Sequence, residues 1–164
     1  MLSASEQSNI LGIHEFEESL KLIHQKRYLE AENYLKQAMK ILKQAQQERS
    51  LGYLYLLKRL GWLSMKNSKF SESEKYFKIA SDMMPQVTSN PLNHFSTKKN
   101  LLLFYIITNL ERAEAYGDEL MGKKEEMLPS QQKELTYLMG NVYLLKGQYQ
   151  FAKNLYRNCL KLGQ

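Results

Sequence analysis

The stretch LKRLGWLSMKNSKFSESEKYFKIASDMMP, residues 57–85, has the spacing of two helices joined by a tight turn. Its apolar and small residues recur every three or four positions, which is helical and not strand-like spacing. Asn67 supplies the turn, and Pro85 predicts the end of the second helix, because proline cannot donate the next backbone hydrogen bond. The residues that carry this spacing are Leu57, Leu60, Gly61 and Ser64 in the first helix and Phe70, Ser73, Tyr76, Phe77 and Ala80 in the second.

This spacing resembles the tetratricopeptide repeat (TPR), a helix–turn–helix unit with a fixed pattern of Trp, Leu, Gly and Tyr, then Ala and Phe, then Pro. All seven positions fall at the spacing of the repeat, although three of them carry a different residue type. They are Leu57, Leu60, Gly61, Ser64, Ser73, Phe77 and Pro85, with Leu57, Ser64 and Ser73 standing for Trp, Tyr and Ala. The resemblance implies antiparallel helix pairs, each packed on the next.

Three weaker copies of the stretch lie elsewhere in the chain. Tyr28, Leu110 and Tyr149 take the place of Phe70, so successive copies are spaced by 42, 40 and 39 residues. This long pitch resembles TPR variants such as those of kinesin light chain. We predict an all-α single domain of four antiparallel helix pairs, stacked as a TPR-like α-solenoid. The alternative is an up-and-down helix bundle, which shares the apolar periodicity. The predicted repeats span residues 12–47, 51–85, 96–122 and 131–164, with a loop at 86–96.

The composition is that of a globular chain that folds without crosslinks. At 164 residues, 43% of them hydrophobic and 24% charged, the chain is long enough to bury a substantial core. Cys159 is the sole cysteine, which excludes an internal disulfide and a cysteine-based zinc cluster and favours a reducing compartment. The longest apolar run, Leu101–Ile107, is far shorter than the roughly 20 residues that span a bilayer. We therefore expect an intracellular protein of the cytosol or mitochondrion that is not secreted.

The sequence contains no arrangement that indicates catalysis. It has neither the phosphate-binding loop pattern nor the dinucleotide-binding glycine pattern. His14, His24 and His94 lack a second ligand at metal-binding spacing, and Glu17 and Glu18 are neighbours that point in different directions on a helix. We expect no cofactor, no metal and no enzymatic activity.

The charge is unevenly distributed, and this leaves two interpretations of function. The chain carries a net charge of +6, and residues 21–80 hold thirteen bases against five acids. The first interpretation is a scaffold or adaptor that binds proteins with acidic segments, as an accessory subunit or assembly factor of a larger complex. The second is an RNA-associated helical-repeat protein that uses the basic 21–80 surface. Filter binding in rising salt separates the two, because nucleic-acid affinity falls steeply with salt.

The TPR resemblance also implies a concave groove lined by the first helix of each pair. Trp62 is the predicted anchor, since it is the sole tryptophan and has Lys58 and Lys66 one helical turn away on either side. Its alternative role is core packing against the third pair. The predicted groove residues are Lys58, Trp62, Met65, Lys66, Lys98, Tyr105, Tyr137 and Asn141.

A second predicted surface is an exposed apolar face on the last helix. Terminal repeats normally need a polar outer face, so apolar residues there predict that a partner covers them. The residues of this predicted face are Leu155, Tyr156, Leu160 and Leu162.

Overall fold

The computed structural model describes the backbone of residues 4–162 and the side chains of residues 12–162. Over that range the chain forms α-helices and one short 3-10 helix and contains no strand, so the predicted all-α class is confirmed. The elements are α1 (Ala4–His24), α2 (Tyr28–Gln44), α3 (Leu51–Lys66), α4 (Phe70–Val87), α5 (Pro91–Thr108), α6 (Leu110–Met121), η1 (Lys124–Glu126), α7 (Pro129–Leu145) and α8 (Tyr149–Leu162).

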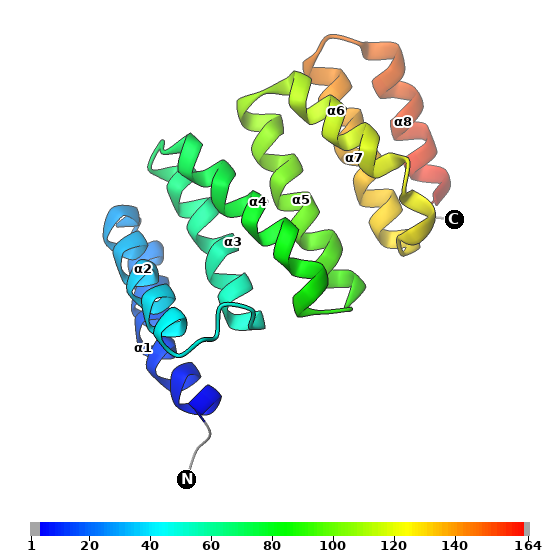
Figure 1. Ribbon diagram of the computed structural model, residues 1–164. Coiled ribbons are helices and arrows are strands. Elements are labelled where there is room, and N and C mark those ends of the chain that lie inside the picture. Colours follow the sequence, from blue (N-terminus) through cyan, green and yellow to red (C-terminus); the bar gives the residue numbers. More distant parts are fainter. Residues whose placement is uncertain (1–3, 163–164) are drawn as a thin grey trace. The chain divides into compact units, whose positions relative to one another are not determined.

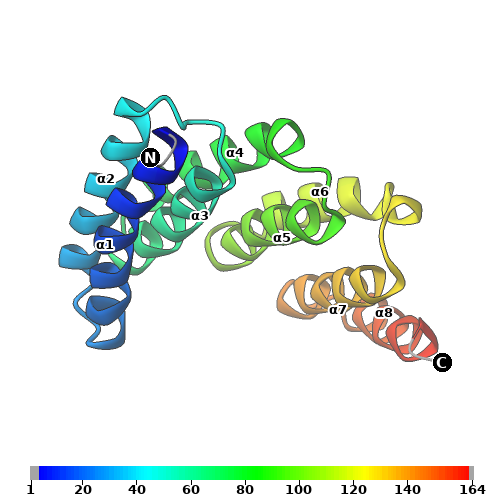
Figure 2. The ribbon, with the colours of Figure 1, turned by 90° about the horizontal axis from the view of Figure 1, so that it is seen from below.

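The internal contacts divide the chain into two compact units, an N-terminal unit (Met1–Ser89) and a C-terminal unit (Asn90–Gln164). In the N-terminal unit, α1 pairs with α2, α3 pairs with α4, and α3 packs against α2. In the C-terminal unit, α5 pairs with α6, α7 pairs with α8, and α7 packs against α6. Figures 1 and 2 show both pairs of each unit as antiparallel hairpins.

A glycine facing an aromatic ring sets the spacing inside two of the helix pairs. A Cβ atom added to Gly61 of α3 would lie 2.6 Å from the ring of Phe77 in α4, closer than real side chains approach. A Cβ atom on Gly140 of α7 would lie 2.5 Å from the ring of Tyr156 in α8. Both glycines therefore lie where an aromatic ring of the second helix packs directly on the backbone of the first helix.

Two predicted boundaries are wrong, both at the junction of the units. The predicted loop at 86–96 is much shorter, because Asn90 caps α5 by accepting a hydrogen bond from the Leu92 backbone N–H and Pro91 occupies the first turn. Pro85 does not end α4, which continues to Val87. Near a helix end the missing proline N–H costs only one backbone bond, so the last turn can still form.

A buried carboxylate joins the two pairs of the N-terminal unit. Glu32 of α2 is only 1% exposed and lies beside the turn between α3 and α4. It accepts a hydrogen bond from Asn67 at 2.8 Å and is 3.1 Å from the ammonium groups of both Lys69 and Lys36. A buried charge must be paired in this way to be tolerated. We call this contact between a helix carboxylate and the next turn the turn clasp.

The C-terminal unit repeats the turn clasp at corresponding positions. Glu114 stands four residues after the start of α6, as Glu32 stands four residues after the start of α2. Its partner is Lys146, which closes α7 as Asn67 closes α3. Lys146 also lies 2.9 Å from Glu111. In both units the clasp fixes the second pair to the preceding helix.

The ring-on-glycine contact predicts opposite effects for two glycines of the same helix. Gly61→Ala should lower the free energy of unfolding by about 1–3 kcal/mol, because the new methyl group collides with Phe77. Gly52→Ala should raise it by about 0.4–1 kcal/mol, since its Cβ would meet only Ser50 Oγ at 3.8 Å. Urea unfolding of both variants checks this, and equal effects would contradict the contact.

The turn clasp of the N-terminal unit predicts a dependence of stability on pH. Burial by itself raises the pKa of Glu32, but hydrogen bonds from Lys36, Asn67 and Lys69 outweigh burial and hold the pKa below its usual value of 4.5. The charged clasp therefore contributes stability above pH 4.5 that is lost as the pH falls through the lowered pKa.

We expect Glu32→Gln to lower the free energy of unfolding at pH 7 by about 1–3 kcal/mol. The gap between wild type and variant should narrow as the pH falls below 4.5. The control is Glu30→Gln in the same helix, because the exposed pair of Glu30 with Arg27 is worth little. A gap that stays constant from pH 7 to pH 3 would show that the charge of Glu32 is not the cause.

Candidate functional site

An apolar groove of about 380 Å³ lies on the N-terminal unit. Residues of α1 and α3 form its two walls, and Leu42 of α2, which is 4% exposed, lies at its floor. None of the described side chains that line it is charged. The lining residues are Gly12, Ile13, Phe16, Leu42, Leu51, Gly52, Tyr55 and Leu56.

The cap and the side-chain spacing of α3 determine which residues form one wall of this groove. Ser50 caps α3 by accepting a hydrogen bond from the Tyr53 backbone N–H at 3.1 Å, so the first turn of α3 starts at Leu51. Leu51 and Tyr55 are four residues apart and therefore share one side of α3. Ile13 is 48%, Leu51 40% and Tyr55 45% exposed, which leaves three large apolar side chains accessible around one hollow.

Basic and aromatic residues continue the α3 wall beyond the groove. Arg59, Trp62 and Lys66 follow Tyr55 at intervals of three or four residues and so extend the same side of the helix. The Lys66 ammonium lies 5.4 Å from the centroid of the Trp62 ring, and that of Lys58 lies 5.7 Å from the centroid of the Tyr55 ring. Because α3 contains no acidic residue, every charged side chain of α3 on this wall is basic.

Trp62 combines parts of both predicted roles. Its ring is half-buried and meets the ring of Tyr28 edge-on, with centroids 5.6 Å apart and planes at 89°. It packs against the core of the N-terminal unit, as Ile23 and Tyr28 of the first pair do. Within the N-terminal unit, the structure thus places Trp62 against the first helix pair. Part of the ring stays exposed beside Lys66.

The predicted groove residues outside the Trp62 region differ in accessibility. Tyr105 is 6% exposed and packs edge-on against Tyr116, so it is a core residue and its assignment to the groove is wrong. Tyr137 is 51% exposed, whereas Asn141 is half-buried and accepts a hydrogen bond from the Tyr156 hydroxyl at 2.7 Å. Met65 and Lys98 are half-buried as well.

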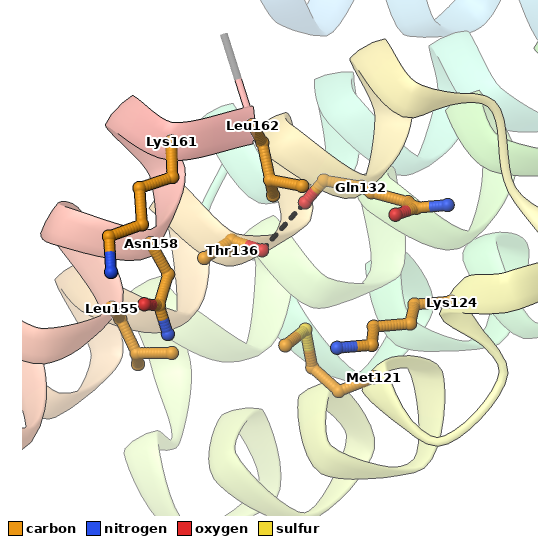
Figure 3. Close-up of a pocket in the computed structure, with 8 residues that line it drawn as sticks. All are labelled: Met121, Lys124, Gln132, Thr136, Leu155, Asn158, Lys161 and Leu162. Atoms are coloured by element: carbon orange, nitrogen blue, oxygen red, sulfur yellow. Dashed lines mark hydrogen bonds between the residues drawn. The ribbon is translucent and has the colours of Figure 1, made fainter. Parts of the chain in front are cut away.

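The four predicted residues of the C-terminal apolar face do not share one face. Leu155 and Leu162 line a separate hollow of about 310 Å³ that α6, η1, α7 and α8 enclose (Figure 3). Tyr156 and Leu160 lie on another side of α8, where Tyr156 covers Gly140 and Leu160 is 71% exposed. The residues that line the hollow are Met121, Lys124, Gln132, Thr136, Leu155, Asn158, Lys161 and Leu162.

Sequence reasoning missed the residues at the centre of the groove. Leu51 and Tyr55 were not predicted, because the repeat pattern begins at Leu57 and gives no weight to the preceding turns of α3. Ile13 of α1 was not among the predicted groove residues either. A usable signal was present: Tyr55 lies seven and Leu51 eleven residues before Trp62, which places all three on one side of a helix. No comparable spacing in the sequence points to Leu42 of α2, because only the packing of the helices shows that it lies at the floor of the groove.

Between residues 12 and 162, no group of three or more His, Cys, Asp or Glu side chains is arranged to hold a metal ion. No helix in the described part of the chain is both long and apolar enough to cross a bilayer.

Comparison with known proteins gives matches in structure only. No protein-family model and no curated protein matches the sequence. Among solved structures, the chain is similar to BtubC (BKLC) from P. vanneervenii, with a TM-score of 0.79 and 17% identity over 94% of this chain and 64% of that one. It is also similar to a putative kinesin light chain from Podosopora anserina with nearly identical TPR-like repeats. That match has a TM-score of 0.80 and 14% identity over 93% of this chain and 74% of that one.

These likenesses show the fold. The chain has an all-α, TPR-like repeat fold, as its spacing predicted, and it spans less than two thirds of the length of BtubC.

The contact between Trp62 and Tyr28 predicts a spectroscopic effect. In Tyr28→Ala the indole of Trp62 loses the ring that covers it, so its fluorescence emission should shift to longer wavelength as water reaches it. Tyr149→Ala removes the corresponding tyrosine of α8 and should leave the emission unchanged. If Tyr28→Ala stays helical by circular dichroism and emits as wild type does, the described contact is absent in solution.

Proposed function

We propose that this chain is a non-enzymatic scaffold that binds a segment of another protein in the apolar groove of the N-terminal unit. The observation that carries the proposal is the set of exposed apolar side chains, Ile13, Leu51 and Tyr55, around a preformed hollow with a buried leucine at its floor. Exposed apolar surface gathered in one concave place marks an interaction site, whereas single exposed apolar residues do not.

A bound segment gains affinity by removing the apolar side chains around the hollow from water. Covering a large apolar side chain contributes roughly 1.5–3 kcal/mol when it is fully removed from water. Three such side chains around one hollow are therefore enough to anchor a segment that inserts apolar residues of its own. Leu42 is already buried, so the floor costs no reorganisation on binding.

The basic residues of α3 beside the groove favour a bound segment that carries negative charge. Arg59 and Lys66 extend the side of α3 that borders the groove, and α3 has no acidic residue to neutralise them. A segment with apolar residues toward the groove and carboxylates toward α3 is complementary to this arrangement. Such charges raise the association rate and the specificity more than the final affinity.

The alternative role in nucleic-acid binding has less support. At least five of the thirteen bases in residues 21–80 form ion pairs with acidic residues of the chain itself, namely Lys21, Arg27, Lys36, Lys69 and Lys78. A base that pairs internally is less available to a phosphate backbone. We therefore place the chain as an accessory subunit or assembly factor of a multiprotein complex, in the cytosol or mitochondrion.

Affinity capture with matched variants tests this function. The tagged wild type, Tyr55→Ala, Arg59→Glu and the control Ile79→Ala would be expressed in cells, and captured proteins would be quantified by mass spectrometry. Ile79 matches Tyr55 in exposure, at 39% against 45%, but lies on α4 away from the groove. We expect a partner whose capture falls with Tyr55→Ala and Arg59→Glu and is unchanged with Ile79→Ala.

The affinity of the identified segment would then be measured by the change in Trp62 fluorescence. Tyr55→Ala should weaken binding by about tenfold or more, the effect of losing a buried aromatic anchor. Arg59→Glu should mainly slow association, and more so at low salt. If every captured protein binds all four forms equally, the groove is not the binding site and the proposal fails.

A further inference from the structure

The ring-on-glycine contact allows the two units to be compared residue by residue. Phe77 follows Gly61 in the N-terminal unit by as many residues as Tyr156 follows Gly140 in the C-terminal unit. Each residue of α3 and α4 therefore has a counterpart in α7 and α8. The carboxylates of the turn clasp align α2 with α6 in the same way. A difference between counterparts then shows where one unit lacks a side chain that the other has.

Two tyrosines of the N-terminal unit have no aromatic counterpart in the C-terminal unit. Tyr53 of α3 is 7% exposed and belongs to the core of the N-terminal unit, and Tyr76 of α4 packs against that core. Their counterparts are Gln132 in α7 and Leu155 in α8, and both line the hollow of about 310 Å³ in the C-terminal unit. We call this the C-terminal hollow. It lies where the N-terminal unit places two phenol rings.

The apolar wall of the C-terminal hollow suits an aromatic ring. Met121 and Leu162 line the hollow, and their counterparts Met39 and Met83 pack against the core of the N-terminal unit. Thr136 of α7, only 4% exposed, lines it as well. A thioether group contacts aromatic rings favourably, and aliphatic side chains pack on them. A ring that enters from outside therefore finds the kind of surface that surrounds the rings of the other unit.

The rim of the C-terminal hollow is basic. Lys124 and Lys161 line it, whereas their counterparts in the sequence are Leu42 and Asp82. Figure 3 shows Lys124 on one side of the hollow and Lys161 with Asn158 on the opposite side. Among the described residues neither lysine has an ion-pair partner, and no acidic residue lines the hollow. An occupant that carries negative charge on both sides matches this rim.

We propose that the C-terminal hollow binds a tyrosine or phenylalanine side chain of a partner segment that carries a carboxylate on each side of that residue. The ring takes the space where the N-terminal unit has its own rings, against Met121 and Leu155. One carboxylate meets Lys124 and the other meets Lys161, beside the Asn158 amide, which donates hydrogen bonds.

A chain segment fits the C-terminal hollow better than a free aromatic acid does. The two lysines stand on opposite sides of the hollow, and a small acid with one carboxylate reaches only one of them. Burial of the ring supplies affinity, and the lysines supply the preference for acidic neighbours. The hollow belongs to a different unit from the apolar groove, so this inference does not depend on the function proposed for that groove.

The test uses the full chain and a capped peptide with one tyrosine between two glutamates in a glycine-serine background. Comparison peptides carry alanine for the tyrosine or glutamine for both glutamates, and phenylacetate serves as a free aromatic acid. Methyl NMR spectra report the signals of Met121, Leu155 and Leu162 and give the dissociation constant. We expect the acidic tyrosine peptide to shift these signals, and each comparison compound to bind at least about tenfold more weakly.

Charge-reversal variants separate the hollow from general attraction to a basic protein. Lys124→Glu with Lys161→Glu should weaken binding about tenfold or more, because both carboxylates of the peptide then meet like charge. The control is Lys123→Glu with Lys153→Glu, which changes the net charge equally at exposed positions that do not line the hollow. The control pair should weaken binding by less than about twofold, since salt screens charges at a distance.

Filling the hollow tests its shape. Gln132→Tyr with Leu155→Tyr restores the two rings of the N-terminal unit and should abolish binding while the chain stays helical by circular dichroism. If this variant does not fold, the peptides and the lysine pairs decide. The proposal is overturned if the methyl signals do not shift, if the alanine peptide or phenylacetate binds as tightly as the acidic tyrosine peptide, or if both lysine pairs weaken binding equally. It is equally overturned if the filled variant folds and binds as wild type does.

Discussion

The packing of an aromatic ring on a helix glycine is the constraint on which the rest of this structure depends. Phe77 lies on Gly61 and Tyr156 lies on Gly140, and each contact sets how closely two antiparallel helices approach. Once that distance is fixed, small residues such as Ala80 and Ala152 can be completely buried between the helices. The turn that joins the two helices then lies within contact distance of a carboxylate on the helix that precedes the pair.

The groove of the N-terminal unit is a consequence of this arrangement. Because α3 packs on α2, the side of α3 that faces α1 is left with an apolar hollow whose floor is Leu42. The helix packing leaves Ile13, Leu51 and Tyr55 accessible around the hollow. The same helix carries bases and no acid, which adds a charge preference to the apolar site. The proposed binding surface and the packing surface are thus two sides of one helix.

The period of the apolar residues was enough to predict the helix pairs but not their ends. The copies spaced by 42, 40 and 39 residues correspond to the observed pairs, since side-chain periodicity is a local property of the sequence. The loop at 86–96 was overestimated because its polar residues include a helix cap, Asn90, and a helical proline, Pro91. Composition alone does not distinguish a cap from a loop. Likewise, Pro85 predicts the end of α4, whereas the last turn of a helix tolerates a proline and α4 continues to Val87.

The sequence by itself determined that the chain is all-helical and that its helices form antiparallel pairs of the TPR-like kind. These properties depend on spacing, which the order of residues fixes directly. Only the tertiary structure decided that Tyr105 is buried, that Leu155 and Tyr156 serve different sides of α8, and that Leu42 lies beneath Ile13 and Tyr55. Those properties depend on which helix covers which side of another, and burial of a side chain is settled by its neighbours in space and not in sequence.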